Sequence, residues 1–443
     1  MVETQLNGIA EKARRCPEER FTSLAHLLNE EHLKHCFEGL KAHKAAGVDG
    51  VTKEEYAKAL DSNIVSLVSL MKQHAFRPAP SRRVYIPKAG SDKKRPLGIP
   101  TLESKLVQMA MRRVLDRIYE AVFLDSSFGF RPGRSAHGAL KKVDTLIRTG
   151  QYHWVVEVDI EGFFDSVNHE HLMKFLKMKI ADPNILRLIV RFLKAGIWEE
   201  GQYLKTDTGT PQGGVISPLL ANIYLHYVLD LWFERRFRRQ CRGEAYLFRY
   251  ADDFVVCFQY REEAERFLKE LKDRLEQFHL EVEPTKTKLL RFGRFARQDE
   301  ARDGKEPETF DFLGFTHHCG NTRAGVFKLQ RRTSKKKFRA KLRDITAWIR
   351  RERHQAKAGL LLRQAKRRLQ GHLNYYAITD NSRLCQSFRD QFARLLFKWL
   401  NRRSQRDSYT WEQFSSALDW VGWPSVRIQR HLDPFRRVGL KQC

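Results

Sequence analysis

The sequence Phe-Arg-Tyr-Ala-Asp-Asp-Phe-Val-Val-Cys-Phe, residues 248–258, sets the organisation of this chain. Aromatic and β-branched residues stand on both sides of a short polar centre, a pattern that predicts a β-hairpin with Asp252 and Asp253 at its turn. Aspartate is a common turn residue, so the pair alone does not indicate chemistry. Whether these two acids have a chemical role depends on which other residues of the chain can act together with them.

A third acid, Asp159, lies near the end of a second apolar run, residues 154–160. Side chains alternate along a strand, so Asp159 is expected on the face opposite Trp154, Val156 and Val158. Carboxylates from neighbouring strands can hold two Mg²⁺ ions about 3.5–4 Å apart, an arrangement suited to in-line nucleotidyl transfer. The three acids are therefore candidate metal ligands.

The composition indicates a large basic protein with a polyanionic partner. In 443 residues, Lys and Arg number 81 against 53 for Asp and Glu, a formal net charge of +28. The length predicts two or more domains. No apolar run is long enough to span a bilayer and no basic amphipathic segment stands alone, so nucleic acid is favoured over a membrane surface.

The cysteines indicate a reducing, cytoplasmic compartment. An odd number of cysteines without a Cys-x-x-Cys pair predicts free thiols and no zinc site. Glu3 and Glu11 argue against an organellar transit peptide. The seven cysteines are Cys16, Cys36, Cys241, Cys257, Cys319, Cys385 and Cys443.

Two loops carry cations that are candidates to hold phosphates. Residues 82–88 and 95–100 predict two extended segments joined by a polar tip, with Lys88 and Arg95 at its ends. Alone, such a tip is a solvated turn, but in a polymerase the two cations would grip an incoming triphosphate. The Gly/Pro loop at 127–134 carries Arg131 and Arg134, which either contact template backbone or only belong to a turn; both interpretations stay open.

Two further features are candidates for nucleotide contacts. Phe164 lies just beyond Asp159, where it would crowd the 2′ position of a nucleotide sugar, although core packing is the more common role of phenylalanine. Residues 208–214, Thr-Gly-Thr-Pro-Gln-Gly-Gly, fit neither the Walker nor the Rossmann spacing. This loop, which includes Gln212, predicts a close approach of a backbone or a base.

From residue 328 to 368 the chain is dense in Lys and Arg, and apolar residues recur there at helical spacing. This pattern predicts folded helices with one basic face that neutralises phosphates, so binding is expected to depend strongly on salt. The cations expected to bind nucleic acid in this region are Arg331, Arg332, Lys335, Lys336, Arg350, Arg351, Lys366 and Arg367.

Six motifs, in order, resemble successive blocks of the reverse transcriptases encoded by group II introns. They are Arg-Pro-Leu-Gly-Ile-Pro (95–100), Gly-Phe-Arg-Pro-Gly (129–133), Val-Asp-Ile with Phe-Phe (158–160 and 163–164), Thr-Pro-Gln-Gly-Gly (210–214), Tyr-Ala-Asp-Asp (250–253) and Phe-Leu-Gly-Phe (312–315). Gln-Gly-His-Leu-Asn-Tyr-Tyr, residues 370–376, resembles the helical maturase region of that family. The resemblance covers roughly residues 47–420.

The resemblance implies an α+β fold, a right-hand polymerase of fingers, palm and thumb. The palm is expected to be mixed α/β with an antiparallel sheet, followed by an all-helical thumb or maturase domain. The implied domains are an N-terminal helical extension (1–75), fingers and palm (76–318), thumb (325–420) and a short basic tail (421–443). No Cys/His-rich endonuclease motif is found, so priming is expected from elsewhere, such as nascent strands at replication forks.

The resemblance also implies roles for individual residues. The implied ligands of two Mg²⁺ ions, or of Mn²⁺ in their place, are Asp159, Asp252, Asp253 and the backbone carbonyl of Ile160. The implied nucleotide contacts are the triphosphate grip Lys88 and Arg95, the sugar gate Phe164, Gln212 of the glycine-rich loop, and Lys286. Residues 102–105, Leu-Glu-Ser-Lys, depart from the family's pattern, so no role is transferred to them.

The implied function is RNA-directed DNA polymerisation, in which a DNA primer is extended on an RNA template with dNTPs. The family also binds its intron RNA to assist splicing and retromobility, which would place the protein in a ribonucleoprotein near a bacterial nucleoid; a homodimer is compatible with this. Two alternatives stay open. One is an RNA-binding maturase whose acids are structural, and the other is a reverse transcriptase domesticated for defence or CRISPR-associated spacer acquisition.

Overall fold

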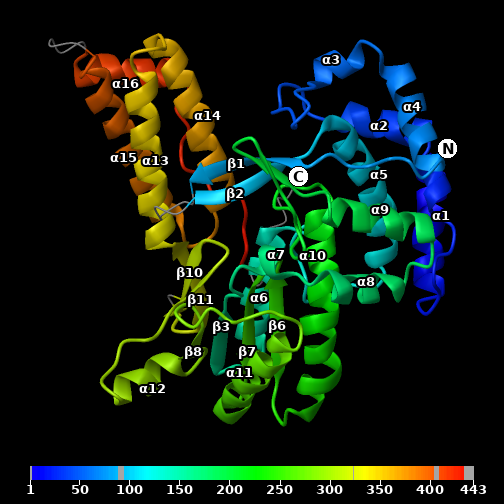
Figure 1. Ribbon diagram of the computed structural model, residues 1–443. Helices are drawn as coiled ribbons and strands as arrows, with labels where there is room; N and C mark the ends of the chain where they lie inside the picture. The colour runs from blue at the N-terminus through cyan, green and yellow to red at the C-terminus, as the bar shows by residue number, and fades with distance from the viewer. Residues whose placement is uncertain (1, 88–93, 323, 404–408, 434–443) are drawn as a thin grey trace, which may run out of the picture. The chain divides into compact units, whose positions relative to one another are not determined.

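A computed structural model of the chain describes residues 2–87, 94–322, 324–403 and 409–433 (Figure 1). The chain divides into two compact units, and neither is a single continuous stretch of sequence. Unit 1 comprises Met1–Ile86, Lys94–Ala139 and Val156–Leu289, and unit 2 comprises Pro87–Lys93, Leu140–Val155 and Leu290–Cys443. Helices and antiparallel strand pairs occur together, which confirms the mixed α+β class.

The N-terminal part of unit 1 is helical, as the sequence predicts. Helices α1 and α2 pack against α5, whose central residues Leu106 and Met111 are fully buried. The Thr101 hydroxyl accepts the Ser104 N–H at 3.3 Å and caps the start of α5. The elements are α1 (Val2–Arg15), η1 (Ala25–Leu27), α2 (Glu30–Gly39), α3 (Lys53–Ala57), α4 (Leu60–Lys72) and α5 (Leu102–Tyr119).

The two extended segments predicted around the basic tip are strands β1 and β2 of one sheet, whose strand order is β2-β1-β4-β5. Strand β1 pairs with β4 in parallel, and β4 forms an antiparallel hairpin with β5. The strands are β1 (Ser81–Pro87), β2 (Lys94–Ile99), β4 (Ile197–Glu199) and β5 (Gln202–Leu204).

The strands that carry or precede the three predicted acids form a second sheet, in the order β6-β7-β3-β8. The predicted hairpin is confirmed, because β6 and β7 pair antiparallel with Tyr250 opposite Asp253. Strand β3 ends directly before Asp159 and is the neighbour of β7 in the sheet. The strands are β6 (Ala245–Tyr250), β7 (Asp253–Phe258), β3 (Trp154–Val158) and β8 (Lys288–Arg291).

A series of helices precedes and connects the strands of this second sheet. A long helix begins at Ser217 with α10, and beyond Leu225 it continues with π-helical geometry through η2 and η3. Helix α11 packs against β7. The elements are α6 (Ala136–Thr149), α7 (Phe163–Ser166), α8 (His169–Lys177), α9 (Pro183–Leu193), α10 (Ser217–Leu225), η2 (His226–Asp230), η3 (Phe233–Phe237), η4 (Arg238–Gln240) and α11 (Arg261–Glu276).

Unit 2 contains an antiparallel sheet in the order β11-β10-β9, followed by a helical bundle. The sequence predicts one strand over residues 310–315, and this prediction is wrong. Leu313 and Gly314 have φ of 52° and 80°, so they form a tight turn that splits the segment into β9 and β10. The elements are α12 (Ala296–Arg302), β9 (Phe310–Phe312), β10 (Phe315–Asn321) and β11 (Phe327–Thr333).

The predicted basic helices are present, although they begin at Lys335 and not at residue 328, which lies in β11. Aromatic and aliphatic side chains such as Ile349, Leu361 and Phe392 form their common core and are fully buried. The helices, coloured yellow to red in Figure 1, are α13 (Lys335–Glu352), α14 (Ala358–Tyr376), α15 (Ser382–Leu400) and α16 (Trp411–Trp420).

Candidate active site

The turn between β6 and β7 has a constrained backbone. Ala251 has φ of 59°, a left-handed conformation that costs a non-glycine residue roughly 1–2 kcal/mol. Gly129 lies directly against this turn, since a Cβ atom there would stand 2.4 Å from the Ala251 nitrogen. The Phe128 N–H donates to the Arg249 carbonyl at 2.8 Å. The Gly/Pro loop therefore supports the turn from one side.

A buried polar network supports the same turn from beneath. Arg249 is 0% exposed and donates to both Asp230 carboxylate oxygens, at 2.7 and 2.6 Å. Its Nη1 also donates to the Asn222 side-chain oxygen at 2.9 Å and to the Ala251 carbonyl at 3.0 Å. The Asn222 amide donates in turn to the Gly129 carbonyl at 2.7 Å. The network thus joins the turn to its supporting loop.

The charges in this network are matched. Burial by itself raises the pKa of Asp230, but the charge and hydrogen bonds of Arg249, with a smaller contribution from the nearby His226 ring, lower it overall, so the carboxylate stays ionised. Sequence reasoning missed Arg249, Asp230 and Asn222 as contributors to the site. A signal was present, because an arginine between Phe248 and Tyr250 in a buried strand requires an internal partner.

Asp252 and Asp159 lie close enough for their charges to interact. Burial raises the pKa of Asp252, and the Asp159 charge raises it further, while Arg95 and Arg249 oppose this shift. Asp159 forms an ion pair with Lys286, and the hydrogen bond to Asp159 raises the pKa of the Lys286 ammonium group. The pair is partly exposed, with 37% of the Asp159 side chain accessible.

The backbone after β3 brings Lys286 to Asp159. The Glu283 N–H donates to the Asp159 carbonyl at 2.8 Å, and Ile160 forms an isolated antiparallel bridge with Val282. Ile160 is 3% exposed, so its side chain belongs to the core. Residues distant in sequence are therefore held beside the predicted metal ligands by main-chain pairing.

Within the described ranges, no three His, Cys, Asp or Glu side chains gather closely enough to hold a metal ion. The donor chemistry fits Mg²⁺, because Asp159, Asp252 and Asp253 offer hard carboxylate oxygens. The Lys286 ammonium group already places one positive charge on Asp159.

The glycine-rich loop docks on α7 and β2. The Thr210 N–H donates to the Phe164 carbonyl at 2.7 Å, and the Gln212 amide donates to Asp165 at 3.3 Å. At Gly213, a Cβ atom would stand 2.4 Å from the Gly98 carbonyl oxygen. The sequence predicts that a backbone or a base approaches the glycine-rich loop closely, and in the structure the backbone of β2 does so.

Phe164 and Arg95 remain available for contacts. The Phe164 ring is half-buried and packs edge-on against Phe163 with centroids 5.5 Å apart. Arg95 is exposed, and its charge reaches Asp252. Lys88, the other predicted triphosphate contact, lies outside the described residues.

Two arginines predicted to bind nucleic acid are instead buried ion-pair partners, which corrects those two assignments. Arg131 is 6% exposed, binds both Glu120 oxygens at 3.0 Å and donates to the carbonyls of Leu124 and Ser127. Arg331 is 0% exposed and binds Asp144 at 2.7 Å. Their guanidinium groups stabilise the fold and are not presented to a ligand.

The other predicted nucleic-acid contacts are more accessible. Arg134 forms an ion pair with Asp125 at 2.6 Å, and Arg351 forms one with Glu352 at 3.0 Å. Lys366 is half-buried. The exposed cations from this prediction are Arg332, Lys335, Lys336, Arg350, Arg351 and Arg367.

The family model described as reverse transcriptase (RNA-dependent DNA polymerase) matches residues 86–317, and the chain belongs to this family. It is 43% identical over 231 residues to group II intron-encoded protein LtrA of Lactococcus lactis subsp. cremoris, covering 51% of this chain and 38% of that protein. The chain thus falls with the group II intron-encoded reverse transcriptases and maturases.

Other relatives show the same relationship. Protein YkfC of Escherichia coli (strain K12) is 36% identical over 238 residues, which cover 47% of this chain and 62% of that protein. Nuclear intron maturase 4, mitochondrial, of Arabidopsis thaliana is 31% identical over 151 residues, which cover 34% of this chain and 18% of that protein. The chain spans less than two thirds of each of these relatives. In the part of the chain that the structure describes, every helix is too short or too polar to cross a membrane.

Proposed function

We propose that this chain is an RNA-directed DNA polymerase of a group II intron, which extends a DNA primer on an RNA template. The observation that carries the proposal is the position of the partly buried Asp252 beside Asp159, at a hairpin turn that the buried Arg249 stabilises. The chain that carries this turn belongs to the reverse transcriptase family. The sheet β2-β1-β4-β5 then belongs to the fingers, the sheet β6-β7-β3-β8 to the palm, and the helices from α13 onward to the thumb.

In this proposal Asp159, Asp252, Asp253 and the Ile160 carbonyl hold two Mg²⁺ ions, with Mn²⁺ as a substitute. When bound, such ions stabilise the charge that develops as the primer 3′-oxygen attacks the α-phosphorus and pyrophosphate leaves. Lys286 forms an ion pair with Asp159, and a metal ion held by that carboxylate would displace the ammonium group. That ammonium group is then free to contact a phosphate.

Other side chains position the nucleotide. Arg95 is exposed near Asp252, where its forked guanidinium suits a triphosphate. Phe164 is held through its backbone by Thr210 and presents its ring to the sugar 2′ position. Gln212, anchored on Asp165, borders the base or template side. Lys88 keeps the triphosphate role that its place in the sequence suggests.

We also propose that the exposed cations of the thumb bind intron RNA and so assist splicing and retromobility, in a cytoplasmic ribonucleoprotein. The relatives named as intron-encoded protein and intron maturase support this second activity. The same names support the competing function, an RNA-binding maturase that does not polymerise.

Two assays on one preparation separate these functions. Wild-type protein with an RNA template, DNA primer and dNTPs is expected to give template-directed extension, and the same protein is expected to accelerate splicing of its intron RNA. Asp252→Asn is expected to lose extension and keep splicing, because RNA binding does not use that carboxylate. Splicing without any wild-type extension would leave the maturase as the function.

A further inference from the structure

The glycine-rich loop, residues 208–214, is bound closely to α7 and the start of α8. The Gly209 N–H donates to the Val167 carbonyl at 2.8 Å, and the Nε2 atom of His169 donates to the Gly209 carbonyl at 2.7 Å. Gly209 has φ of 83°, and a Cβ atom there would stand 2.9 Å from the Asp165 carbonyl oxygen. The backbone of the loop is therefore fixed directly beside Asp165.

Gln212 of this loop is held both by its backbone and by its side chain. Its backbone carbonyl accepts the Gly98 N–H of β2 at 2.6 Å. Its side-chain nitrogen Nε2 lies 3.3 and 3.4 Å from the two carboxylate oxygens of Asp165. The contact with Gly98 fixes where the residue stands, and the contact with Asp165 fixes where its amide group points.

The Asp165 carboxylate decides which end of the Gln212 amide remains for a ligand. A carboxylate only accepts hydrogen bonds, whereas a glutamine amide has a donor end and an acceptor end. The donor Nε2 therefore faces Asp165, and the acceptor Oε1 is left to receive a hydrogen bond from a ligand. Without such a partner the terminal torsion of a glutamine has two broad orientations, which exchange the two ends.

Asp165 is also linked to the side chain that is proposed to select the sugar. It directly follows Phe164 in α7, and its N–H donates to the Gly162 carbonyl at 2.8 Å. The Phe164 carbonyl in turn accepts the Thr210 N–H of the loop. One helical turn thus carries both the proposed sugar gate and the carboxylate that holds the Gln212 amide.

We propose that Asp165 is a positioning residue for nucleotide addition, which orients the Gln212 amide so that its Oε1 atom faces the incoming nucleotide. This inference deepens the proposed function and rests on it for the presence of a nucleotide. Asp165 is exposed, so a direct contact of its carboxylate with a metal ion or the nucleotide is the competing role. The test below separates the two roles.

Asp165→Asn tests the orientation in steady-state addition of dNTP at saturating primer–template. An asparagine side chain has nearly the same shape but can face either end of the Gln212 amide. The KM for dNTP is expected to rise about threefold to tenfold, because part of the population loses a hydrogen bond of ordinary strength to the nucleotide. The kcat is expected to stay within about twofold, because the contact contributes to binding. Asp165→Glu keeps a carboxylate and should restore most of the KM.

A second substitution shows whether Asp165 acts through Gln212. Gln212→Leu removes both ends of the amide and should itself raise the KM for dNTP. Adding Asp165→Asn to Gln212→Leu should raise the KM no further, because the coupled group is gone. An equal factor in both backgrounds, or an unchanged KM in Asp165→Asn, would overturn the proposal. A hundredfold loss of kcat in Asp165→Asn would instead show that the carboxylate touches the reacting groups.

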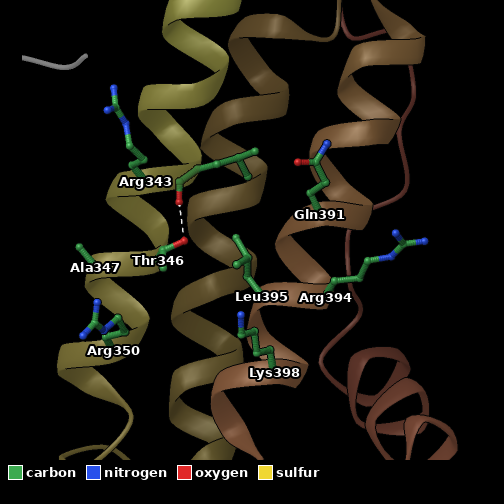
Figure 2. Close-up of a pocket in the computed structure, with 9 residues that line it drawn as sticks. Arg343, Thr346, Ala347, Arg350, Gln391, Arg394, Leu395 and Lys398 are labelled. Carbon is green, nitrogen blue, oxygen red and sulfur yellow. Dashed lines mark hydrogen bonds between the residues drawn. The ribbon is translucent and has the colours of Figure 1, made fainter. Parts of the chain in front are cut away.

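Gln391 provides the matched control. It is an exposed glutamine on α15 and lines a groove of about 520 Å³ between α13 and α15 (Figure 2). Its amide donates to the Ser387 hydroxyl at 3.0 Å, within its own helix. Gln391→Leu is expected to keep the wild-type KM for dNTP. A rise equal to that in Gln212→Leu would overturn the proposal, because loss of any surface amide would then suffice.

A measurement without catalysis separates this inference from the proposed function. In the full chain, isotope-labelled at its glutamine side-chain nitrogens, the NMR signals absent from Gln212→Leu and from Gln391→Leu identify those two amides. Asp165→Asn is expected to shift the Gln212 signals and to leave the Gln391 signals in place. Unshifted Gln212 signals would overturn the inference even in an active polymerase. Wild-type protein that never extends a primer would reject the proposed function, while shifted signals would still support the orientation of the amide by Asp165.

Discussion

At the scale of single residues, the site depends on how a few polar groups are held. Asp252 is partly buried and close to a second acid, an arrangement that is costly unless a cation joins it. Arg249, Asp230 and Asn222 fix the turn that presents Asp252. The predicted metal ligand Asp252 is thus positioned by buried residues that are not themselves predicted ligands.

Asp230→Asn tests this support. The substitution leaves the Arg249 guanidinium buried beside a neutral amide, so the free energy of unfolding is expected to fall by about 3–5 kcal/mol. Urea denaturation measures the loss, and nucleotide addition by the folded fraction is expected to slow because the Ala251 carbonyl loses a fixed donor. Asp273→Asn on the exposed face of α11 is the control and should change neither quantity. Wild-type stability in Asp230→Asn would contradict the buried network.

Phe164 is expected to select deoxyribonucleotides by excluding a 2′-hydroxyl. Phe164→Ala opens that space, so the ratio of kcat/KM for dNTP over the matching rNTP should drop about tenfold to a hundredfold. Phe164→Tyr keeps the ring and should keep the selectivity. If Phe164→Ala discriminates as well as wild type, the ring serves only packing.

At the scale of elements, the glycine-rich loop depends on backbone contact with β2. Gly213 has φ of 111°, and an added Cβ would meet the Gly98 carbonyl at 2.4 Å, whereas Gly201, with φ of 83°, has nothing within 4 Å. Gly201→Ala should cost only the strain of a left-handed alanine, about 1–2 kcal/mol. Gly213→Ala should lower the free energy of unfolding, measured by thermal denaturation, by more than Gly201→Ala does, and it should also raise the KM for dNTP. Equal costs would show that the loop does not need its contact with β2.

The helical bundle and the β9–β11 sheet of unit 2 bury neutral histidines. Burial lowers the pKa of His372 to about 3, with Lys341 adding to the shift, and its ring stacks on Phe388 with centroids 3.6 Å apart. Burial likewise lowers the pKa of His317 to about 3. The unfolded chain binds protons at these histidines near pH 6.5 and the folded chain does not, so stability falls as pH drops below about 6.5.

Each of these histidines is expected to lower the free energy of unfolding by about 2 kcal/mol when the pH falls from 7 to 5, since one pKa unit corresponds to about 1.36 kcal/mol. His372→Phe removes the titrating group and keeps the stack, so this variant should lose less stability on acidification than wild type. Urea denaturation at both pH values measures the difference, with exposed His354→Phe as the control. An unchanged pH dependence in His372→Phe would mean that this ring is protonated in the folded protein.

The elements show what sequence can and cannot supply. Periodic patterns predict the β6–β7 hairpin and the strand before Asp159, because both are local features. The same patterns could not show that Arg331 pairs with Asp144, since the two are separated by 187 residues. The turn inside residues 310–315 was missed because Leu313, a poor residue for positive φ, hides it.

At the scale of the whole molecule, the net charge is +28, and the cations that produce it have two different roles. Some cations are buried partners of acids, as Arg131 and Arg249 are, and these set the fold. Others are exposed on the thumb helices without acidic partners, and these are expected to set the affinity for nucleic acid. Composition predicts the partner class, while only the structure separates the two groups of cations.

The central claim is that the Asp252 carboxylate takes part in nucleotide addition. The direct measurement is the rate of adding one dNTP to a DNA primer on an RNA template with Mg²⁺, for wild type, Asp252→Asn and Asp273→Asn. Asp252→Asn should be slower by at least about a hundredfold, because an amide cannot replace a metal-binding carboxylate, and Asp273→Asn should match wild type. Equal rates for wild type and Asp252→Asn would contradict the claim.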